Sequence, residues 1–284
     1  MARTLSSSGG IYHIDEVGVH SSLDAVVTKH SSFCDRWAEK HTVCRHTVEA
    51  FQRAQDFVSR FHHESGDDAV APLPLILDSG CGTGRSSVII ARDNPDVPVL
   101  GLDRSLVRLT RNAFYDGRAD EGDQPPNLLL LRCDLVDFWF LAHGLVASRQ
   151  WAIARHYILY ANPYPKNSQL KQRWHGHPVF PYLLMLEADE IVLRSSWRTY
   201  LEEFDSATRL LGLGCNGGGD TTADDARTAA AISRAAASYA NGSGPCELRC
   251  SDKDVVLTNF EEKYRVAGQP TYELCLRKEG GSSM

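Results

Sequence analysis

The sequence has no apolar run long enough to cross a membrane, and its first residues lack the apolar core of a secretory signal. Its 8 cysteines are scattered, and Cys246 and Cys250 have no second pair at a spacing that zinc sites use. The formal net charge of -6 excludes a protein that coats nucleic acid by charge alone, although a local basic strip can still contact phosphates. We therefore expect an intracellular protein of the cytoplasm, or of the nucleus in a eukaryote, with reduced thiols and no bound metal or membrane contact.

The length of 284 residues and the 43% hydrophobic content suffice for one domain with a full core. Residues 1–30 are polar and punctuated by glycine, which predicts a flexible N-terminal arm. Residues 31–284 are then expected to form a single domain. It begins with a helical region at 31–66, where apolar residues from Phe33 to Val58 recur at helical spacing.

Strand and helix signals alternate through the middle of the chain to about residue 205, which is typical of a parallel sheet. The Ala- and Gly-rich segment 212–245 interrupts this alternation. We expect it to be a surface insertion with a marginal helix, because alanine favours helix but buries little apolar surface. Two strand-like segments, 255–261 and 271–277, are expected to return to the sheet. The predicted fold is α/β, with a mostly parallel, doubly wound, Rossmann-like sheet and helices on both faces.

The most informative stretch runs from Leu75 to Ile90, where an apolar run, a glycine-rich turn and a second apolar run follow one another. This order predicts a buried strand, a tight turn and the start of a helix. Gly80, Gly82 and Gly84 stand at alternate positions, so a flat ligand can approach the backbone of the turn. Asp78 precedes the first glycine by two residues. For this motif alone, an ordinary turn with Asp78 capping the helix is the alternative interpretation.

Acidic residues also end the next two predicted strands, at Asp103 and at Asp134. A carboxylate in this place can hold a ribose diol. The glycines are spaced G-x-G-x-G and not G-x-G-x-x-G as in dinucleotide sites. Carboxylates also suit a cationic sulfonium and ammonium group better than a pyrophosphate. The pattern therefore favours a methyltransferase that uses S-adenosyl-L-methionine (SAM) over a nicotinamide enzyme.

A proline-framed loop, Asn162–Lys166, follows the fourth predicted strand, His156–Tyr160. In an open α/β sheet, ligands bind beyond the carboxyl ends of the strands, so this loop is expected to face the cofactor. Its two prolines restrict the backbone around an amide, an aromatic ring and an ammonium group. The amide of Asn162 can hold the edge of a base, and the ring of Tyr164 can stack on a purine.

A basic stretch with one tryptophan and two histidines comes next, from Asn167 to Pro178. Lys171 and Arg173 suit phosphate contacts, and Trp174 suits base stacking. A solvated loop whose tryptophan is buried in the core is the alternative. Because the stretch follows a loop expected to act in methyl transfer, contact with RNA is the favoured interpretation.

Taken together, these residues resemble the tRNA (guanine-N7-)-methyltransferase family, whose catalytic loop typically reads Asp-Pro-Trp-Pro-Lys. Asn162–Lys166 matches that loop, Ser195–Trp197 matches its Thr-Asp-Trp-like strand end, and Thr258–Glu261 matches its Thr-Lys-Phe-Glu motif. The resemblance covers roughly residues 75–205 and 255–278. It implies a class I SAM-dependent methyltransferase that acts on tRNA. We expect a monomer or homodimer, with an accessory subunit as the alternative.

The resemblance also implies roles for single residues. Asn162 is the expected catalytic residue. The expected cofactor contacts are Asp78, Gly80, Gly82, Gly84, Asp103, Asp134 and Asn162. The expected substrate contacts, including the two basic residues inferred from the stretch above, are Lys166, Lys171, Arg173, Ser196, Thr258 and Glu261.

Two departures remove a carboxylate from the expected target pocket, because Asn162 and Ser196 stand where the family has aspartate. Guanine N7 carries a lone pair and no proton, so its methylation needs alignment more than a base. Glu202, Glu203 or Glu261 could return negative charge, although a solvated helix face is expected for the first two. Amino-group methylation of a base, methylation of a small molecule, and a catalytically weak RNA-binding protein remain as alternatives.

Overall fold

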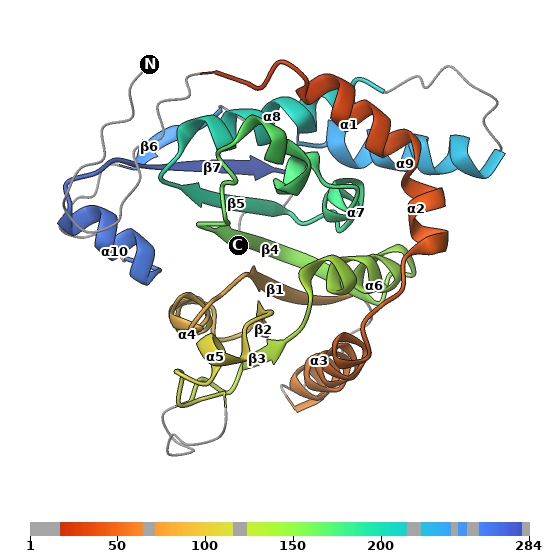
Figure 1. Cartoon of the computed structure of the whole chain (residues 1–284). Coiled ribbons are helices and arrows are strands. Elements are labelled where there is room, and N and C mark those ends of the chain that lie inside the picture. The colour runs from red at the N-terminus through yellow and green to blue at the C-terminus, as the bar shows by residue number, and fades with distance from the viewer. Residues whose placement is uncertain are drawn as a thin grey trace.

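A computed structural model describes residues 18–64, 72–115, 124–214, 223–239, 244–248 and 256–279. In these residues, seven strands form one sheet in the order β3-β2-β1-β4-β5-β7-β6 (Figure 1). The strands are β1 (Leu73–Ser79), β2 (Val99–Asp103), β3 (Leu128–Arg132), β4 (Trp151–Leu159), β5 (Glu190–Ser195), β6 (Cys246–Leu248) and β7 (Thr271–Arg277). Strands β1 to β5 pair in parallel, whereas β7 is antiparallel to both β5 and β6. The predicted Rossmann-like α/β fold is therefore confirmed.

Helices of the described residues connect and cover these strands. They are α1 (Leu23–Ser32), α2 (Cys34–Lys40), α3 (Arg45–Glu64), α4 (Arg85–Asp93), α5 (Leu106–Leu109), α6 (Leu135–Ala147), α7 (Phe180–Met185), α8 (Arg198–Gly212), α9 (Ala223–Ala237) and α10 (Asn259–Val266). Two short 3-10 helices, η1 (Asn167–Gln172) and η2 (Trp174–Gly176), lie in the long connection between β4 and α7. None of the helices in the described ranges is long and apolar enough to span a membrane.

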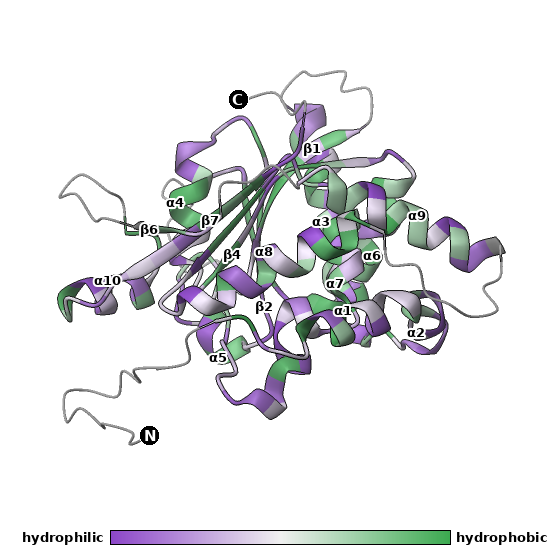
Figure 2. Cartoon of the chain, turned by 90° about the horizontal axis from the view of Figure 1, so that it is seen from above, coloured by the Kyte–Doolittle hydropathy of each residue, from purple (hydrophilic) through white to green (hydrophobic). Residues whose placement is uncertain are grey.

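Strands β1 and β2 are buried on both faces of the sheet, which explains why each is an apolar run up to its C-terminal end. On one face, Ile76 of β1 packs with Ile90 of α4 and Leu109 of α5. On the other face, Leu77 and Leu193 belong to a larger core that includes α3, α6, α7 and α8. Figure 2 shows α3, α6 and α7 on one side of the strands and α4 on the other.

The N-terminal residues from Leu23 onward are not the flexible arm that composition predicts for 1–30. Leu23 and Val27 are buried on α1, which packs against α8. The prediction failed because only the few apolar residues of this polar helix face the core, and short amphipathic helices have a weak sequence signal. The predicted helical region that follows is present as α2 and α3, separated by a break at residues 41–44.

Helix α9 corrects the prediction that segment 212–245 is a surface insertion. Ile232, Ala236 and Tyr239 are buried, and α9 packs against both α7 and α8 (Figure 1). The Tyr239 hydroxyl donates a hydrogen bond to the carbonyl oxygen of Ala188 at 2.6 Å. Small residues permit this packing, because a β-carbon on Gly212 would lie only 3.0 Å from the Cα of Ala237. Alanine therefore contributes close helix approach as well as helix propensity.

The predicted strand at 255–261 is also wrong within the described residues, because α10 begins at Asn259. Thr258 caps this helix, and its hydroxyl accepts a hydrogen bond from the amide of Glu261 at 3.0 Å. Thr258 and Glu261 have the spacing of a capping box, so the sequence contained the signal for a helix start. The strand predicted at 271–277 is confirmed as β7.

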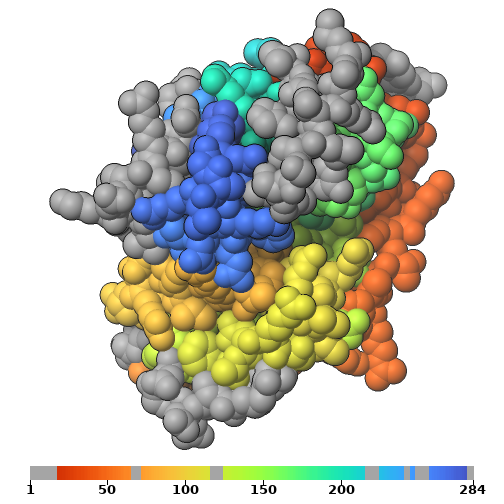
Figure 3. Space-filling view, turned by 60° about the vertical axis from the view of Figure 1, so that its left-hand side comes forward, coloured from red at the N-terminus to blue at the C-terminus, as the bar shows by residue number. Residues whose placement is uncertain are grey.

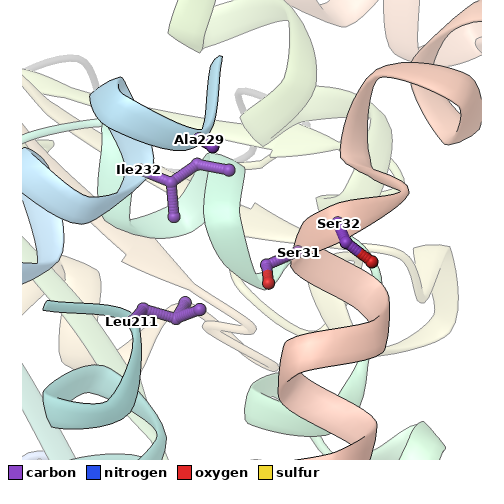
Figure 4. A pocket seen from close by; sticks show the side chains of 5 residues that line it. All are labelled: Ser31, Ser32, Leu211, Ala229 and Ile232. Carbon is purple, nitrogen blue, oxygen red and sulfur yellow. The ribbon is translucent and has the colours of Figure 1, made fainter. Parts of the chain in front are cut away.

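A small hollow lies where α1, α8 and α9 meet (Figure 4). It is lined by Ser31, Ser32, Leu211, Ala229 and Ile232. None of the residues predicted to bind cofactor or substrate lines it, so it is a packing defect between helices and not the expected site.

The close contact between α8 and α9 predicts opposite effects for two Gly→Ala substitutions. Gly212→Ala forces the backbone of α9 to move, which we expect to cost about 1–3 kcal/mol and to outweigh the helix-propensity gain of about 1 kcal/mol. Gly144→Ala in α6 is the matched control, because its β-carbon would meet nothing within 4 Å. It should raise the unfolding free energy by up to about 1 kcal/mol. Urea unfolding measures both, and equal stabilisation by the two changes would contradict the tight packing of α9.

Candidate functional site

The glycine turn between β1 and α4 has the backbone conformation that requires glycine. Gly80, Gly82 and Gly84 have φ values of 81°, 62° and 74°, which side chains disfavour. A β-carbon on Gly80 or Gly82 would approach no atom closer than 3.9 Å, so this side of the turn is open. At Gly84 a β-carbon would lie 2.9 Å from side-chain atoms of Asn112 and Leu130. The first two glycines therefore leave room for a ligand, and the third permits close packing of α4 on the sheet.

Asp78 lies at the end of β1 beneath this turn and is 1% exposed. The hydroxyl groups of Ser86 and Ser87, in the first turn of α4, donate hydrogen bonds to its Oδ2 at 2.6 and 2.7 Å. Its other oxygen, Oδ1, is buried and makes no hydrogen bond. Burial, with a smaller contribution from the charge of Asp103, raises the pKa of Asp78 to about 6. A buried carboxylate oxygen without a partner favours the binding of a cation or a hydrogen-bond donor at this place.

Asp103 ends β2, directly beside β1. Its carboxylate accepts hydrogen bonds from the amide of Gly82 at 2.9 Å and from the amide of Ser105 at 2.7 Å. The guanidinium group of Arg108 lies 3.6 Å from the same carboxylate. Asp103 therefore fixes the glycine turn to the neighbouring strand, and each of its oxygens still has a lone pair for a further donor.

Asp134 follows β3 and caps α6, where its side chain accepts a hydrogen bond from the amide of Val136 at 2.9 Å. Its own amide donates a hydrogen bond to the hydroxyl of Thr47 at 3.0 Å, so α3 also contacts this corner. The predicted acids thus follow three adjacent strands at one edge of the sheet. The open turn, the unpaired oxygen of Asp78 and the remaining lone pairs of Asp103 fit a ligand with cationic groups and ribose hydroxyls, as SAM has.

The Asn162 loop, residues Asn162–Lys166, leaves the same edge after β4. Tyr160 and Tyr164 have φ values of 53° and 46°, a conformation that is rare for residues with side chains and often occurs at functional sites. Asn162 is exposed, and its Oδ1 accepts a hydrogen bond from the amide of Tyr164 at 3.3 Å. Lys166 is also exposed. The loop therefore presents an amide and an ammonium group to solvent from a bent backbone.

Arg173 and Lys171, both predicted to contact the substrate, differ in exposure. Lys171 is exposed, as a phosphate contact requires. Arg173 is 1% exposed and pairs with Glu203 through hydrogen bonds of 2.8 and 2.6 Å from Nη1. Its guanidinium group also lies over the ring of Trp197, 4.7 Å from the centroid. A side chain enclosed in this way cannot reach an RNA phosphate, so the substrate-binding role predicted for Arg173 is not supported.

Glu203 also differs from expectation, since the sequence predicts a solvated helix face for Glu202 and Glu203. Glu202 pairs with Arg198 on the surface of α8. Glu203 is buried among Arg173, His175 and the backbone amide of His20, all within 3.0 Å of its carboxylate. Sequence reasoning missed this cluster because the helical period of α8 does not reveal which polar residue faces a buried arginine.

The corner after β5 lies beside the Asn162 loop. The amide of Tyr160 donates a hydrogen bond to the carbonyl oxygen of Arg194 at 2.8 Å. Ser196, two residues further on, is half-buried. The side chain of Arg194 reaches Glu261 on α10 at 2.9 Å and Glu273 on β7 at 2.7 Å. Arg194 was missed in the sequence, although a charged residue inside the apolar run of β5 is a signal for a buried ion pair.

Glu261 is therefore not open to a substrate, which corrects the prediction that it binds one directly. It is 4% exposed and both of its oxygens accept hydrogen bonds, from Arg194 and from the amide of Leu257. Thr258 is half-buried and its hydroxyl caps α10. Among the described residues, the carboxylates predicted at the target pocket are thus replaced, at Asn162 and Ser196, or ion-paired, at Glu261.

Helix α10 contacts the start of α4, directly after the glycine turn. Arg85, the first residue of α4, donates a hydrogen bond to the side chain of Asn259 at 2.9 Å and also pairs with Glu262. Figure 3 shows α10 lying against the surface of α4. Phe260 on α10 is 56% exposed, and Tyr264 stacks on Tyr160 with 6.1 Å between ring centroids. Aromatic side chains therefore stand at the border of the edge that carries the acids.

Comparison with known proteins agrees with this geometry. Residues 72–204 match a family model described as "Putative methyltransferase". A tRNA (guanine-N(7)-)-methyltransferase from Clostridium beijerinckii is 23% identical over 137 residues, which are 46% of this chain and 56% of that protein. The resemblance inferred from the sequence is confirmed. The matched residues include the glycine turn, the strand-end acids and the Asn162–Lys166 loop, and the chain spans about half the length of the curated relative it matches.

Solved structures of methyltransferases also resemble the chain. One, titled an antibiotic-related methyltransferase, has a TM-score of 0.48 at 10% identity, covering 84% of this chain and 96% of that chain. Another is a variant of the 16S rRNA (adenine(1408)-N(1))-methyltransferase from Catenulisporales acidiphilia with SAM, with a TM-score of 0.44 at 16% identity, covering 80% and 93%.

The raised pKa of Asp78 predicts a stability effect that depends on pH. Because the proton binds the folded chain more tightly than the unfolded chain, the stability that Asp78 contributes is complete below pH 4 and is lost as the pH rises through about 6. Asp78→Asn removes the charge and keeps the shape. Near pH 4 the variant should melt at almost the same temperature as the wild type. At pH 8, without ligand, its free energy of unfolding should exceed that of the wild type by on the order of 1–3 kcal/mol.

Thermal melts of the wild type and Asp78→Asn across this pH range measure the effect. Asp96→Asn is the matched control, since it removes an exposed carboxylate from the loop after α4. A stability difference between Asp78→Asn and the wild type that does not change with pH would contradict the burial of a charged Asp78.

Proposed function

We propose that this protein is a SAM-dependent methyltransferase that transfers a methyl group to N7 of guanine in tRNA. The proposal is carried by one observation: the Asn162 loop, the β5 corner and the start of α10 meet at the sheet edge that holds Asp78 and Asp103. These are the segments on which the resemblance to the tRNA (guanine-N7-)-methyltransferases rests. The relative from Clostridium beijerinckii supports the same choice of target.

The carboxyl edge of β1, β2 and β3 is the proposed cofactor site. Oδ1 of Asp78 is suited to a cationic group, and Asp103 to ribose hydroxyls. Gly80 and Gly82 leave the space that the ligand needs, and Asp134 borders it from β3. When bound, SAM supplies an electrophilic methyl carbon on a sulfonium group.

The chain's own residues then have to hold the acceptor base in line with that methyl group. N7 of guanine has an in-plane lone pair and no proton, so alignment is the main requirement. The side-chain oxygen of Asn162 is exposed and can point a dipole at the ring as it becomes cationic. Ser196 and Thr258 are half-buried near the same corner and are proposed to border the base.

Amino-group methylation of a base is the second candidate, and the ion pair of Glu261 favours it. A base methylated at N7 becomes cationic, and a free carboxylate would stabilise that charge. Here Glu261, which pairs with Arg194 at the end of β5, is already neutralised by that arginine. An exposed amide such as Asn162 can instead accept a hydrogen bond from an exocyclic amino group.

The decisive experiment incubates the purified protein with SAM and unmodified tRNA and identifies the product nucleosides by mass spectrometry. We expect 7-methylguanosine, and Asp103→Ala should abolish the product because the variant cannot hold the cofactor. A methylated amino group on adenine or cytosine would instead establish the second candidate. Methylation of metabolite extracts but not tRNA would refute RNA as the substrate, and absence of SAM binding would leave only an RNA-binding role. A tRNA substrate is consistent with an enzyme of the cytoplasm, or of the nucleus in a eukaryote.

Exposed lysines beside the Asn162 loop are proposed to contact tRNA phosphates. Replacing Lys166 and Lys171 together by alanine should weaken tRNA binding at low salt and reduce the slope of log affinity against log salt by about 1–2. Arg53→Ala with Arg60→Ala is the control, since it removes the same charge from exposed positions on α3. Filter binding over a range of salt concentrations tests this, and equal slopes for the wild type and the lysine variant would place the RNA elsewhere.

A further inference from the structure

Arg173 contacts two segments of the proposed acceptor site at once. Its Nε donates a hydrogen bond to the carbonyl oxygen of Tyr164, in the Asn162 loop, at 3.1 Å. Its guanidinium group also lies over the ring of Trp197, which follows Ser196 at the corner after β5. The proposed chemistry assigns no role to this buried cation. Because the guanidinium group is planar and its donors are rigidly arranged, it sets both the distance and the orientation between the segments.

The position of Arg173 is itself held by Glu203. Both carboxylate oxygens of Glu203 accept hydrogen bonds from Nη1 of Arg173, and each of the two side chains is 1% exposed. His175 lies 2.9 Å from the same carboxylate, and the amide of His20 donates a hydrogen bond to it at 3.0 Å. A buried charge is tolerated only when it is paired, so the cluster favours a single arrangement of these groups.

The carbonyl group that Arg173 holds belongs to a residue in a strained conformation. Tyr164 has a φ of 46°, and such a backbone persists only where its surroundings restrain it. Its amide contacts Oδ1 of Asn162, and its carbonyl contacts Arg173. The restraint on Tyr164 is therefore transmitted directly to the exposed amide that the proposed function requires.

We propose that Arg173, fixed by Glu203, is a positioning residue that holds the Asn162 loop against the β5 corner for methyl transfer. This inference rests on the proposed function, in which Asn162 faces the acceptor base. Arg173 touches neither cofactor nor base. It acts by keeping Asn162 and Ser196 at one separation, so its loss should affect alignment in the reaction more than binding of the reactants.

Arg173→Lys tests this, because lysine keeps the charge but loses the planar fork and the stacking on Trp197. We expect kcat on tRNA to fall by about 10- to 100-fold, while the Kd for SAM and the KM for tRNA change by less than about 3-fold. Arg45→Lys is the matched control, since Arg45 is exposed and, among the described residues, pairs with exposed Glu49 on α3, and it should leave all three constants unchanged. A kcat equal to that of the wild type would overturn the proposal.

A structural role alone predicts a different pattern. If the loss of kcat merely equals the fraction of the variant that is unfolded at the assay temperature, measured by circular dichroism, the proposal is also overturned. If Arg173→Lys does not fold, Glu203→Asp decides the question in the same way, since it keeps the charge pair but shortens the arm that places Arg173.

Hydrogen–deuterium exchange separates failure of this inference from failure of the proposed function. The amides of residues 161–170 should exchange at least about 10-fold faster in Arg173→Lys than in the wild type, with or without a substrate. If wild-type protein does not methylate tRNA but the exchange rate rises as expected, the function is wrong and the restraint on the loop stands. Unchanged exchange in a folded variant would refute the restraint, whatever the substrate proves to be.

Discussion

The parallel pairing of β1 with β2 and β4 is the constraint on which the rest of the site depends. Asp78 on β1 is in register with Gly101 on β2 and with Tyr157 on β4, so the three strands end at the same edge of the sheet. Each parallel strand must be followed by a crossover, and the residues just after the strands therefore gather above that edge. Asp103 reinforces the arrangement, because it ends β2 while accepting a hydrogen bond from Gly82 in the turn after β1. A change in the register between β1 and β2 would therefore move Asp78, Asp103 and the glycine turn apart.

The carboxylates at this edge differ in whether they have a cationic partner. On the side of β1 and β2, Asp78 keeps one oxygen without a partner, and burial raises its pKa to about 6. That arrangement reduces stability at neutral pH and is the kind of strain that a cationic ligand relieves. On the side of β5 and α10, Arg194 is balanced by Glu261 and Glu273, and below the loop Arg173 is balanced by Glu203. The first side keeps a carboxylate oxygen without a partner, whereas the charges on the second side are paired with one another.

This contrast bears on the choice between acceptor chemistries. The family resemblance implies carboxylates around the target base, yet two of these positions are Asn162 and Ser196, and Glu261 is ion-paired. What remains toward solvent is an amide, a hydroxyl-bearing corner and exposed lysines. Such groups align a base and contact a phosphate backbone, and they stabilise a cationic product only through dipoles. The rate of the reaction would then depend strongly on alignment, which is why the hold of Arg173 on the loop matters.

The strands, the glycine turn and the strand-end acids were predictable from the sequence, because each leaves a local pattern of residues in the chain. A buried parallel strand needs a continuous apolar run, and a turn of this shape needs glycine at positions with positive φ. Apart from the start of α10, which the local pair Thr258 and Glu261 sets, the corrected predictions concern residues whose partners are distant. Whether α9 lies on the surface depended on Gly212 and Ala237 meeting. Whether Arg173 reaches solvent depended on Glu203, 30 residues away in sequence.

The sequence by itself thus determined the class of fold and the sheet edge at which the strand-end acids gather, since local pattern and strand order suffice for both. Only the tertiary structure decided which charged side chains remain open at that edge. Arginine and glutamate look the same in a sequence whether they are solvated or paired. Their state depends on which buried partner lies opposite, and packing alone brings such partners together.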